Sequence, residues 1–96
     1  MSRRPYIRNG DRTSVGGQVE TPERNDMLDG RIAAYEDDRI WCPKCQTYGR
    51  IGCIGARLPE FGAGGKRPAL ADDLCLCECQ PYPVLIPSQT NSFSGT

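Results

Sequence analysis

The chain has 96 residues with 12 basic and 12 acidic side chains, so it has no overall attraction for nucleic acid or for an acidic membrane. Leu, Ile, Val and Phe together number 17, which is too few for stability from apolar packing alone in so small a domain. The chain also lacks the high net charge that is typical of disordered chains. We therefore expect a single folded domain over residues 1–96, stabilised by contacts other than apolar packing.

The predicted elements are short β-prone segments separated by glycine and proline, so we expect an all-β, loop-rich fold. The basic N-terminus has no apolar run behind it, so neither a signal peptide nor a membrane span is expected. One helical turn is expected after Thr21, because Pro22 suits the first helical position. Residues 58–65 are expected to form a surface loop. Residues 81–96 are expected to form an extended, proline-rich tail along the surface, with no effector domain fused to it.

Six cysteines are the remaining candidates for stabilising contacts, and their spacing favours metal binding over disulfides. In a reducing cytosol, clustered cysteines are typical of metal sites. Cys42 and Cys45 form a C-x-x-C pair whose sulfur atoms can reach one tetrahedral ion. Cys75, Cys77 and Cys79 alternate along a predicted strand, which would place all three on one face. The chain has no histidine, so a metal site must be rich in sulfur, which favours zinc; an iron–sulfur cluster would use the same ligands.

An internal repeat relates these cysteines to one another. Segments 30–42 and 65–77 match in register, because glycine, a basic residue, alanine, an acidic pair and cysteine recur at a constant offset of 35 residues. Cys42 and Cys77 are therefore equivalent positions. A fainter third copy begins at residue 10 and has Val15 in place of the cysteine. The repeat predicts three hairpin-like β units with pseudo-threefold symmetry, fastened by one metal ion where they converge, and aspartates that form turns and do not catalyse.

These motifs together resemble the PAAR family, which is named for a Pro-Ala-Ala-Arg motif and caps the spike of bacterial type VI secretion systems. Residues 10–17 are similar to the family's opening G-D-x-T-x-H-G-G, and Pro68-Ala69 stand where the family has its Pro-Ala. Residues 38–45 resemble the segment around the family's metal site. The resemblance covers nearly the whole chain. It implies a cone-like module whose broad base sits on a trimeric spike of valine-glycine-repeat proteins.

The resemblance also implies a role without catalysis. We expect a spike-tip protein that sharpens the spike for membrane puncture and attaches a separate effector or adaptor. It would sit as a monomer on the trimer, with no nucleic-acid partner and no stable membrane insertion. It would wait in the bacterial cytoplasm and then be secreted with the spike. No catalytic or organic-cofactor residues are expected.

The chain departs from the family pattern at a ligand position. Family members hold zinc near the sharp end with mixed histidine and cysteine ligands, whereas Val15 stands at the position of the family's opening histidine and cannot bind metal. One structural zinc ion would then need additional thiolates. The expected ligands are Cys42, Cys45, Cys77 and Cys79, with Cys75 as the alternative to Cys79. Cys53 is expected to be a small buried thiol in preference to a ligand.

Two other classes of protein use similar cysteine pairs. A zinc-ribbon module that binds nucleic acid or protein is the main alternative, but it expects a second C-x-x-C with basic and aromatic neighbours. Here the second group is C-x-C-x-C, and Asp72, Asp73 and Glu78 surround it with acid. A redox enzyme using Cys42 and Cys45 is a third hypothesis, and no βαβ pattern supports it.

Overall fold

Short strands make up the regular structure of the protein. A computed structural model describes residues 4–55, 60–89 and 92–94. The strands are β1 (Arg4–Pro5), β2 (Arg12–Thr13), β3 (Gln18–Glu20), β4 (Met27–Leu28), β5 (Arg31–Ile32), β6 (Arg39–Cys42), β7 (Thr47–Gly52), β8 (Leu74–Leu76), β9 (Leu85–Ile86) and β10 (Phe93–Ser94). The described residues also include one 3-10 turn, η1 (Ala63–Gly65). The all-β fold class is therefore confirmed. The helical turn expected after Thr21 was wrong, because residues 21–24 have no regular secondary structure.

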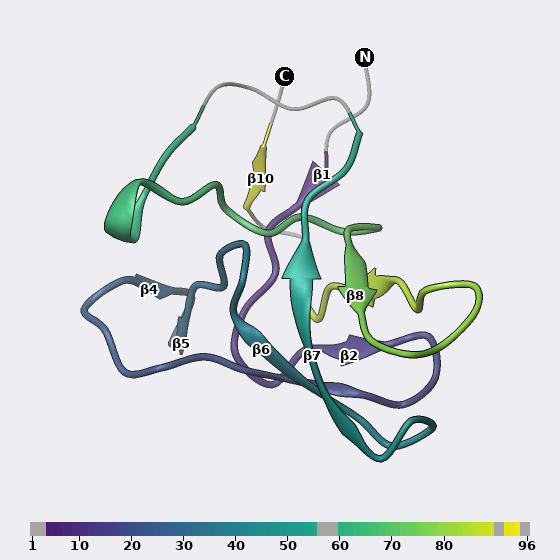
Figure 1. Ribbon diagram of the computed structural model, residues 1–96. Helices are drawn as coiled ribbons and strands as arrows, with labels where there is room; N and C mark the ends of the chain where they lie inside the picture. Colours follow the sequence, from purple (N-terminus) through teal and green to yellow (C-terminus); the bar gives the residue numbers. More distant parts are fainter. Residues whose placement is uncertain (1–3, 56–59, 90–91, 95–96) are drawn as a thin grey trace.

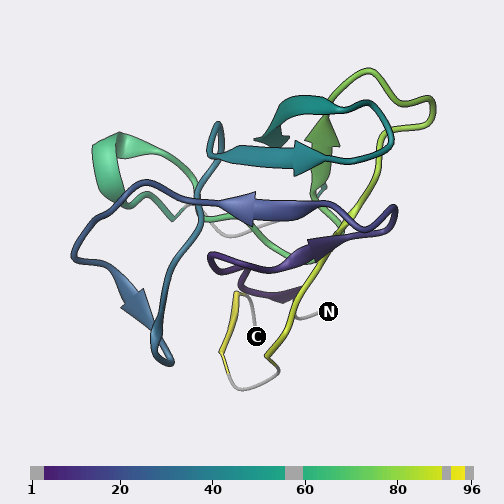
Figure 2. The same ribbon diagram turned by 90° about the horizontal axis from the view of Figure 1, so that it is seen from below.

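Six of these strands form one curled sheet in the order β8-β7-β6-β3-β2-β9 (Figures 1 and 2). A bridge between Leu74 and Val84 joins β8 to the residue before β9, so the two ends of the sheet meet and the sheet closes into a small barrel. The sheet consists of three hairpin-like units, β2–β3, β6–β7 and β8–β9. Each unit pairs with the next through β3–β6, β7–β8 and β9–β2.

A closed ring of three backbone hydrogen bonds relates the units by a pseudo-threefold axis. Ile7 N donates to Ala69 O at 2.9 Å, Ala69 N donates to Ala34 O at 2.9 Å, and Ala34 N donates to Ile7 O at 3.0 Å. We call this triangle the base ring, since one hairpin follows each of its members in the chain. All three residues are buried. The repeat predicted from the sequence is thus confirmed as three equivalent structural units.

One aspartate in each unit forms the turn that leads into the hairpin. Its side chain accepts the backbone N–H of the residue three positions earlier, at 2.9 Å for Asp11 and 2.8 Å for Asp38 and Asp73. The prediction that these aspartates are turn formers is confirmed. Each also pairs with an arginine from elsewhere in the chain; the pairs are Asp11–Arg31, Asp38–Arg24 and Asp73–Arg4. These cations compensate carboxylates that are almost completely buried.

The second strand of each unit supplies a fully buried apolar side chain to the core. Val19, Ile51 and Leu85 occupy these equivalent positions, because each donates its N–H to the carbonyl oxygen of its unit's aspartate. The tail expected to lie along the surface from Pro81 onwards therefore contributes Leu85 to the centre of the molecule. The mobile polar end expected for the tail falls partly on residues 90–91 and 95–96, which lie outside the described residues.

Two smaller strand pairs flank the barrel. β1 pairs with β10, and β4 pairs with β5. Figures 1 and 2 both place β4, β5 and η1 on one side of the molecule, and the β6–β7 turn and the segment after β8 on the other. We call the first side the broad end and the second side the narrow end. Within the described part of the chain, no helix has the length and apolar character needed to cross a membrane.

Candidate metal centre

The turn between β6 and β7 carries the first two sulfur atoms at the narrow end. Cys42 is the last residue of β6 and stands opposite Thr47 of β7. Residues 43–46 connect the two strands, and Gln46 closes the turn with a φ of 54°. The turn brings Cys45 back beside Cys42, which is fully buried. The C-x-x-C spacing thus produces a pair of neighbouring thiols, as the sequence predicted.

The segment after β8 carries the other two sulfur atoms. β8 ends at Leu76, and the N–H of Cys77 donates to the carbonyl oxygen of Cys75 at 3.0 Å, so the chain turns tightly at this point. Cys79 follows in the bent segment, and its side chain is buried. Because the two units are equivalent, the ends of the second and third hairpins present their thiols to each other.

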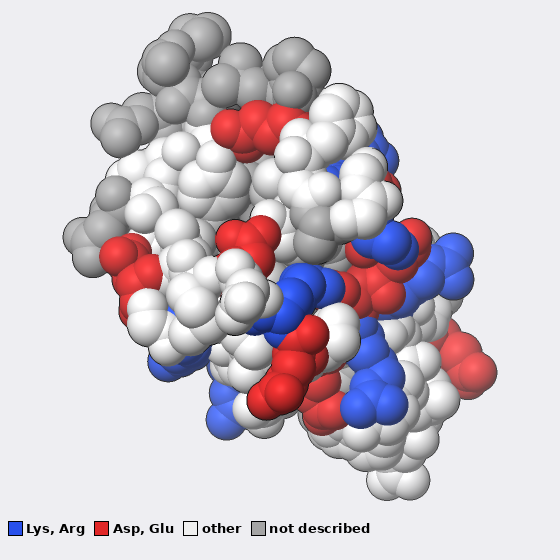
Figure 3. Space-filling model, turned by 90° about the vertical axis from the view of Figure 1, so that its left-hand side faces the viewer, with Lys and Arg blue, Asp and Glu red and all other residues white. Residues whose placement is uncertain are grey.

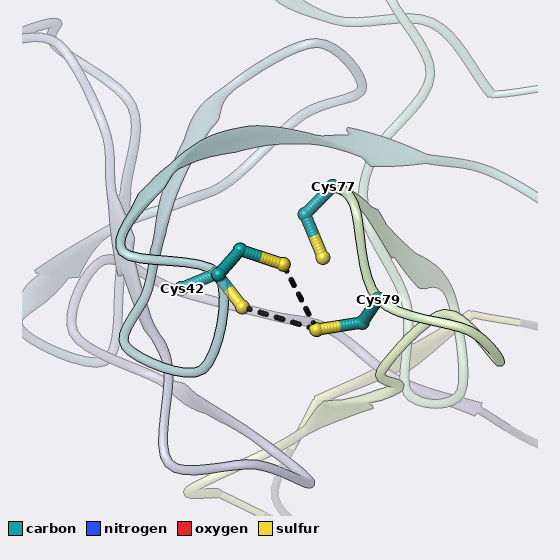
Figure 4. A group of neighbouring side chains, drawn as sticks. Cys42, Cys77 and Cys79 are labelled. Carbon is teal, nitrogen blue, oxygen red and sulfur yellow. Dashed lines mark hydrogen bonds between the residues drawn. The ribbon is translucent and has the colours of Figure 1, made fainter.

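The four Sγ atoms of Cys42, Cys45, Cys77 and Cys79 lie within 4.8 Å of one another, and we call this group the cysteine cluster. Sγ of Cys79 lies 3.6 Å from that of Cys42 and 3.0 Å from that of Cys45. Figure 4 shows Cys42 facing Cys77 and Cys79 from the opposite side. Four thiolates around a tetrahedral zinc ion, with zinc–sulfur bonds of about 2.3 Å, would lie about 3.8 Å apart. The cluster therefore has the ligand chemistry and compactness to hold a metal ion.

The neighbouring sulfur atoms change one another's acidity. The Cys45 thiol and burial raise the pKa of Cys79. The Cys79 thiol lowers the pKa of Cys45, but burial and the thiols of Cys77 and Cys42 outweigh it, so this pKa is raised. Burial opposes ionisation of Cys42, yet the Cys45 N–H and the thiols of Cys79 and Cys77 lower its pKa overall. The surrounding protein groups thus lower the pKa of Cys42 and raise the pKa of Cys45 and of Cys79. A bound cation would let these thiols ionise.

The other two cysteines lie apart from the cluster. Cys75 is fully buried within the apolar core, where burial is the main cause that raises its pKa to about 12. The expectation that Cys75, Cys77 and Cys79 share one face of a strand was wrong, because the strand ends at Leu76 and the chain then turns. Cys53 is partly buried and packs against the core, with its Sγ 4.0 Å from the carbonyl oxygen of Pro68. The structure thus groups Cys79, and not Cys75, with the other three predicted ligands.

Two features of the structure escaped the sequence analysis. The arginines that pair with the buried aspartates come from irregular distances along the chain, so no spacing pattern marks them. A cavity at the broad end, described below, is lined by four separate segments of the chain. The residues that line this cavity form no sequence motif, and they come together only in the folded structure.

The fold and the cysteine cluster define a small all-β module that is built from three hairpins around a pseudo-threefold axis and can hold a metal ion at one end. A sequence model of the family described as PAAR motif matches residues 9–82, which is well over half of the chain. The chain belongs to the PAAR-motif family, a structural family of type VI secretion spike tips. No curated protein and no solved structure gave a significant match.

Proposed function

We propose that this protein is a tip that caps the trimeric valine-glycine-repeat spike of a bacterial type VI secretion system. The observation that carries the proposal is the base ring, which gives a single chain three similar units around one axis. A threefold partner can make three similar contacts only with a surface that approximates its own symmetry. Membership of the PAAR-motif family supports the same role.

The metal centre fits this role as a structural clip. We assign Cys42, Cys45, Cys77 and Cys79 as the ligands of one zinc ion, because four thiolates and no histidine form a closed tetrahedral set. Such an ion would tie the ends of two hairpins together at the narrow end, where little room remains for an apolar core. A site closed by four protein ligands leaves no open position for a substrate, so the proposed role is mechanical and not enzymatic.

The remaining parts of the proposal follow from the spike-tip role. The protein would wait in the bacterial cytoplasm as one chain on the end of the spike trimer. It would then leave the cell with the spike and lead it through the target membrane. A separate effector or adaptor would travel on the tip.

Complex formation with a cognate trimeric spike tests the function directly. We expect size-exclusion chromatography with light scattering to show one chain bound per spike trimer. Phe61→Ser, at an aromatic residue of the broad end that is 68% exposed, should weaken the complex. Tyr82→Ser, at a 40% exposed aromatic residue just beyond the cysteine cluster, should leave it unchanged.

Two results would overturn the spike-tip function. One is a folded protein that forms no complex with the spike at micromolar concentration. The other is tight binding to single-stranded or duplex nucleic acid at physiological salt without spike binding, which would favour the zinc-ribbon alternative.

A further inference from the structure

A cavity of about 400 Å³ lies at the broad end of the molecule, against the base ring. Its apolar wall includes Ile7 and Ala34 of the ring, together with Ala33 and Pro68. Phe61 also lines the cavity and is largely exposed, so an apolar rim is open to a partner. The volume is near the lower end of the range for small-molecule sites. It suits one long side chain better than a large ligand.

Two carboxylates, Asp26 and Glu60, also line this cavity, and a tyrosine hydroxyl positions each of them. The hydroxyl of Tyr6 donates to both oxygens of Glu60, at 2.9 and 3.0 Å, and the hydroxyl of Tyr35 donates to Asp26. Each carboxylate has further lone pairs that can accept hydrogen bonds from a ligand. We call this site the acidic cavity.

Within the described residues, the carboxylates of the acidic cavity have no ion-pair partner, although the charge of Arg24 also attracts Asp26. In residues 4–55, 60–89 and 92–94, no arginine or lysine forms an ion pair with Asp26 or Glu60. Arg24 lies over the Tyr35 ring at 4.9 Å, but its guanidinium pairs with Asp38. Both cavity carboxylates are partly buried, so a cation that entered would exchange water for charge-assisted hydrogen bonds.

Figure 3 shows the side of the molecule that carries β4, β5 and η1. Towards the upper left of this view, acidic side chains stand singly among residues without charge, whereas acidic and basic side chains mix below and to the right. The mixed region agrees with the ion pairs in which Arg24, Arg67 and Lys66 take part. Uncompensated acid beside apolar surface complements a side chain with an aliphatic stem and a cationic end.

We propose that the acidic cavity receives the side chain of one lysine or arginine from the trimeric spike protein on which the broad end sits. The identity of this partner rests on the proposed function. The stem of the side chain packs on Leu28, Ala33 and Pro68, which line the cavity and are partly exposed, and its charged end lies between Asp26 and Glu60. The tyrosine rings that line the cavity add contacts between the cation and an aromatic face.

In the part of the chain that the structure describes, the chemistry of the acidic cavity occurs once around the pseudo-threefold axis. The positions equivalent to Tyr6 are Ala33 and Pro68, as the base ring shows, and neither has a hydroxyl that could orient a carboxylate. A trimeric spike offers three identical basic side chains at its end. One of them enters the acidic cavity, so the tip is fixed in one of three equivalent rotational positions.

Titration with a small probe tests the cavity on the protein alone. The probe is N-acetyl-lysine methylamide, and N-acetyl-norleucine methylamide, which has a similar stem without the charge, is its control. We expect the lysine probe to shift the NMR resonances of Tyr6, Ala34 and Tyr35 with saturation in the millimolar range. The norleucine probe should bind at least tenfold more weakly. Equal shifts with both probes, or no saturable binding of the lysine probe, would overturn the proposal.

A double variant identifies the carboxylates responsible. Asp26→Asn with Glu60→Gln removes two charges but keeps oxygens that accept the tyrosine hydrogen bonds, so the fold should persist. We expect it to weaken lysine-probe binding at least tenfold. Glu23→Gln with Asp72→Asn makes the same charge change at exposed side chains outside the cavity lining and should bind as the parent does. Unchanged probe binding by the cavity variant would overturn the assignment.

The same pair of variants, measured against a cognate spike trimer, separates this inference from the spike-tip function. We expect the cavity variant to bind the spike at least tenfold more weakly than the control variant. If the parent protein and the cavity variant bind the spike equally well, the spike-tip function stands and the proposed occupant is wrong. If the folded parent does not bind the spike, the spike-tip function is wrong, and so is the proposed occupant of the cavity. The probe titration still reports whether the cavity binds a cation.

Discussion

Removing the zinc ion that we propose for the cysteine cluster should lower the free energy of unfolding, by an amount that depends on the spacing of the proposed ligands in the chain. Cys42 and Cys77 are 35 residues apart in the sequence, and a bound ion joins them as a cross-link does. The chain-entropy expression for a loop of this length gives about 4 kcal/mol at 25 °C. A small domain has a free energy of unfolding of roughly 5–15 kcal/mol, so this loss would be a large share of the total.

Urea denaturation with and without a chelator measures this difference. Trp41 precedes Cys42 and is the sole tryptophan, so its fluorescence reports on the segment that the ion would hold. Elemental analysis should find about one zinc ion per chain, and an absorbance typical of an iron–sulfur cluster should be missing. Cys77→Ser should lower the unfolding midpoint about as much as chelation does, and a chelator should then have little further effect.

Cys53→Ser is the matched control, because Cys53 is a cysteine outside the cluster. This variant should keep its metal ion and should lose about as much stability on chelation as the parent does. An unfolding midpoint of the parent that does not change when the metal is removed would refute the structural role of the site. Metal loss caused by Cys53→Ser would refute the ligand assignment.

Three further predictions concern the fold itself. Asp73→Ala should lower the free energy of unfolding by about 3–5 kcal/mol in urea denaturation, because it removes the carboxylate that pairs with Arg4 and accepts the buried N–H of Leu70 and the partly buried N–H of Ile54. A loss below about 1 kcal/mol would contradict this. Gly17→Ala would place a Cβ 2.7 Å from the Trp41 carbonyl oxygen, so it should cost about 1–3 kcal/mol, and an unchanged thermal midpoint would argue against this contact. Burial raises the pKa of Cys75, so the unfolded chain loses this proton first as pH rises above about 8.5. Stability of the metal-free protein should therefore fall from there towards pH 11, and Cys75→Ala should flatten this slope in denaturation series.

The repeat made the three units predictable, because one aspartate serves the same local purpose in each unit. The aspartate bonds to a backbone N–H three residues earlier, so its effect depends on nearby sequence alone. The second strand of each unit has no such signature. Leu85 follows Asp73 by 12 residues, whereas Val19 follows Asp11 by only 8, because the turns differ in length. Sequence spacing alone therefore did not identify Leu85 as a core residue.

The cysteines show both what alternation along the sequence can predict and where it fails. Chelate spacing and the repeat correctly bring Cys42, Cys45 and Cys77 together. In a continuous strand, alternation would place the side chains of Cys75 and Cys77 on the same face. The strand ends at Leu76, so this prediction does not extend to Cys77. The Cys77 N–H donates a hydrogen bond to the Cys75 carbonyl oxygen, and no pattern in the sequence predicts this tight turn. This turn sends the Cys75 side chain into the core and leaves the next two cysteines at the narrow end.

The base ring also joins positions that lie far apart in the chain. Its three hydrogen bonds join residues 7, 34 and 69, and the barrel closes only when Leu85 bonds to Asp73 and β9 reaches β2. Contacts between such distant positions make folding slow, because each requires a long loop to close before any compensating contact forms. On the ribosome, the first two hairpins would emerge long before their third partner. The outer edge of β7 would stay unpaired until β8 arrived, and that of β2 until β9 arrived.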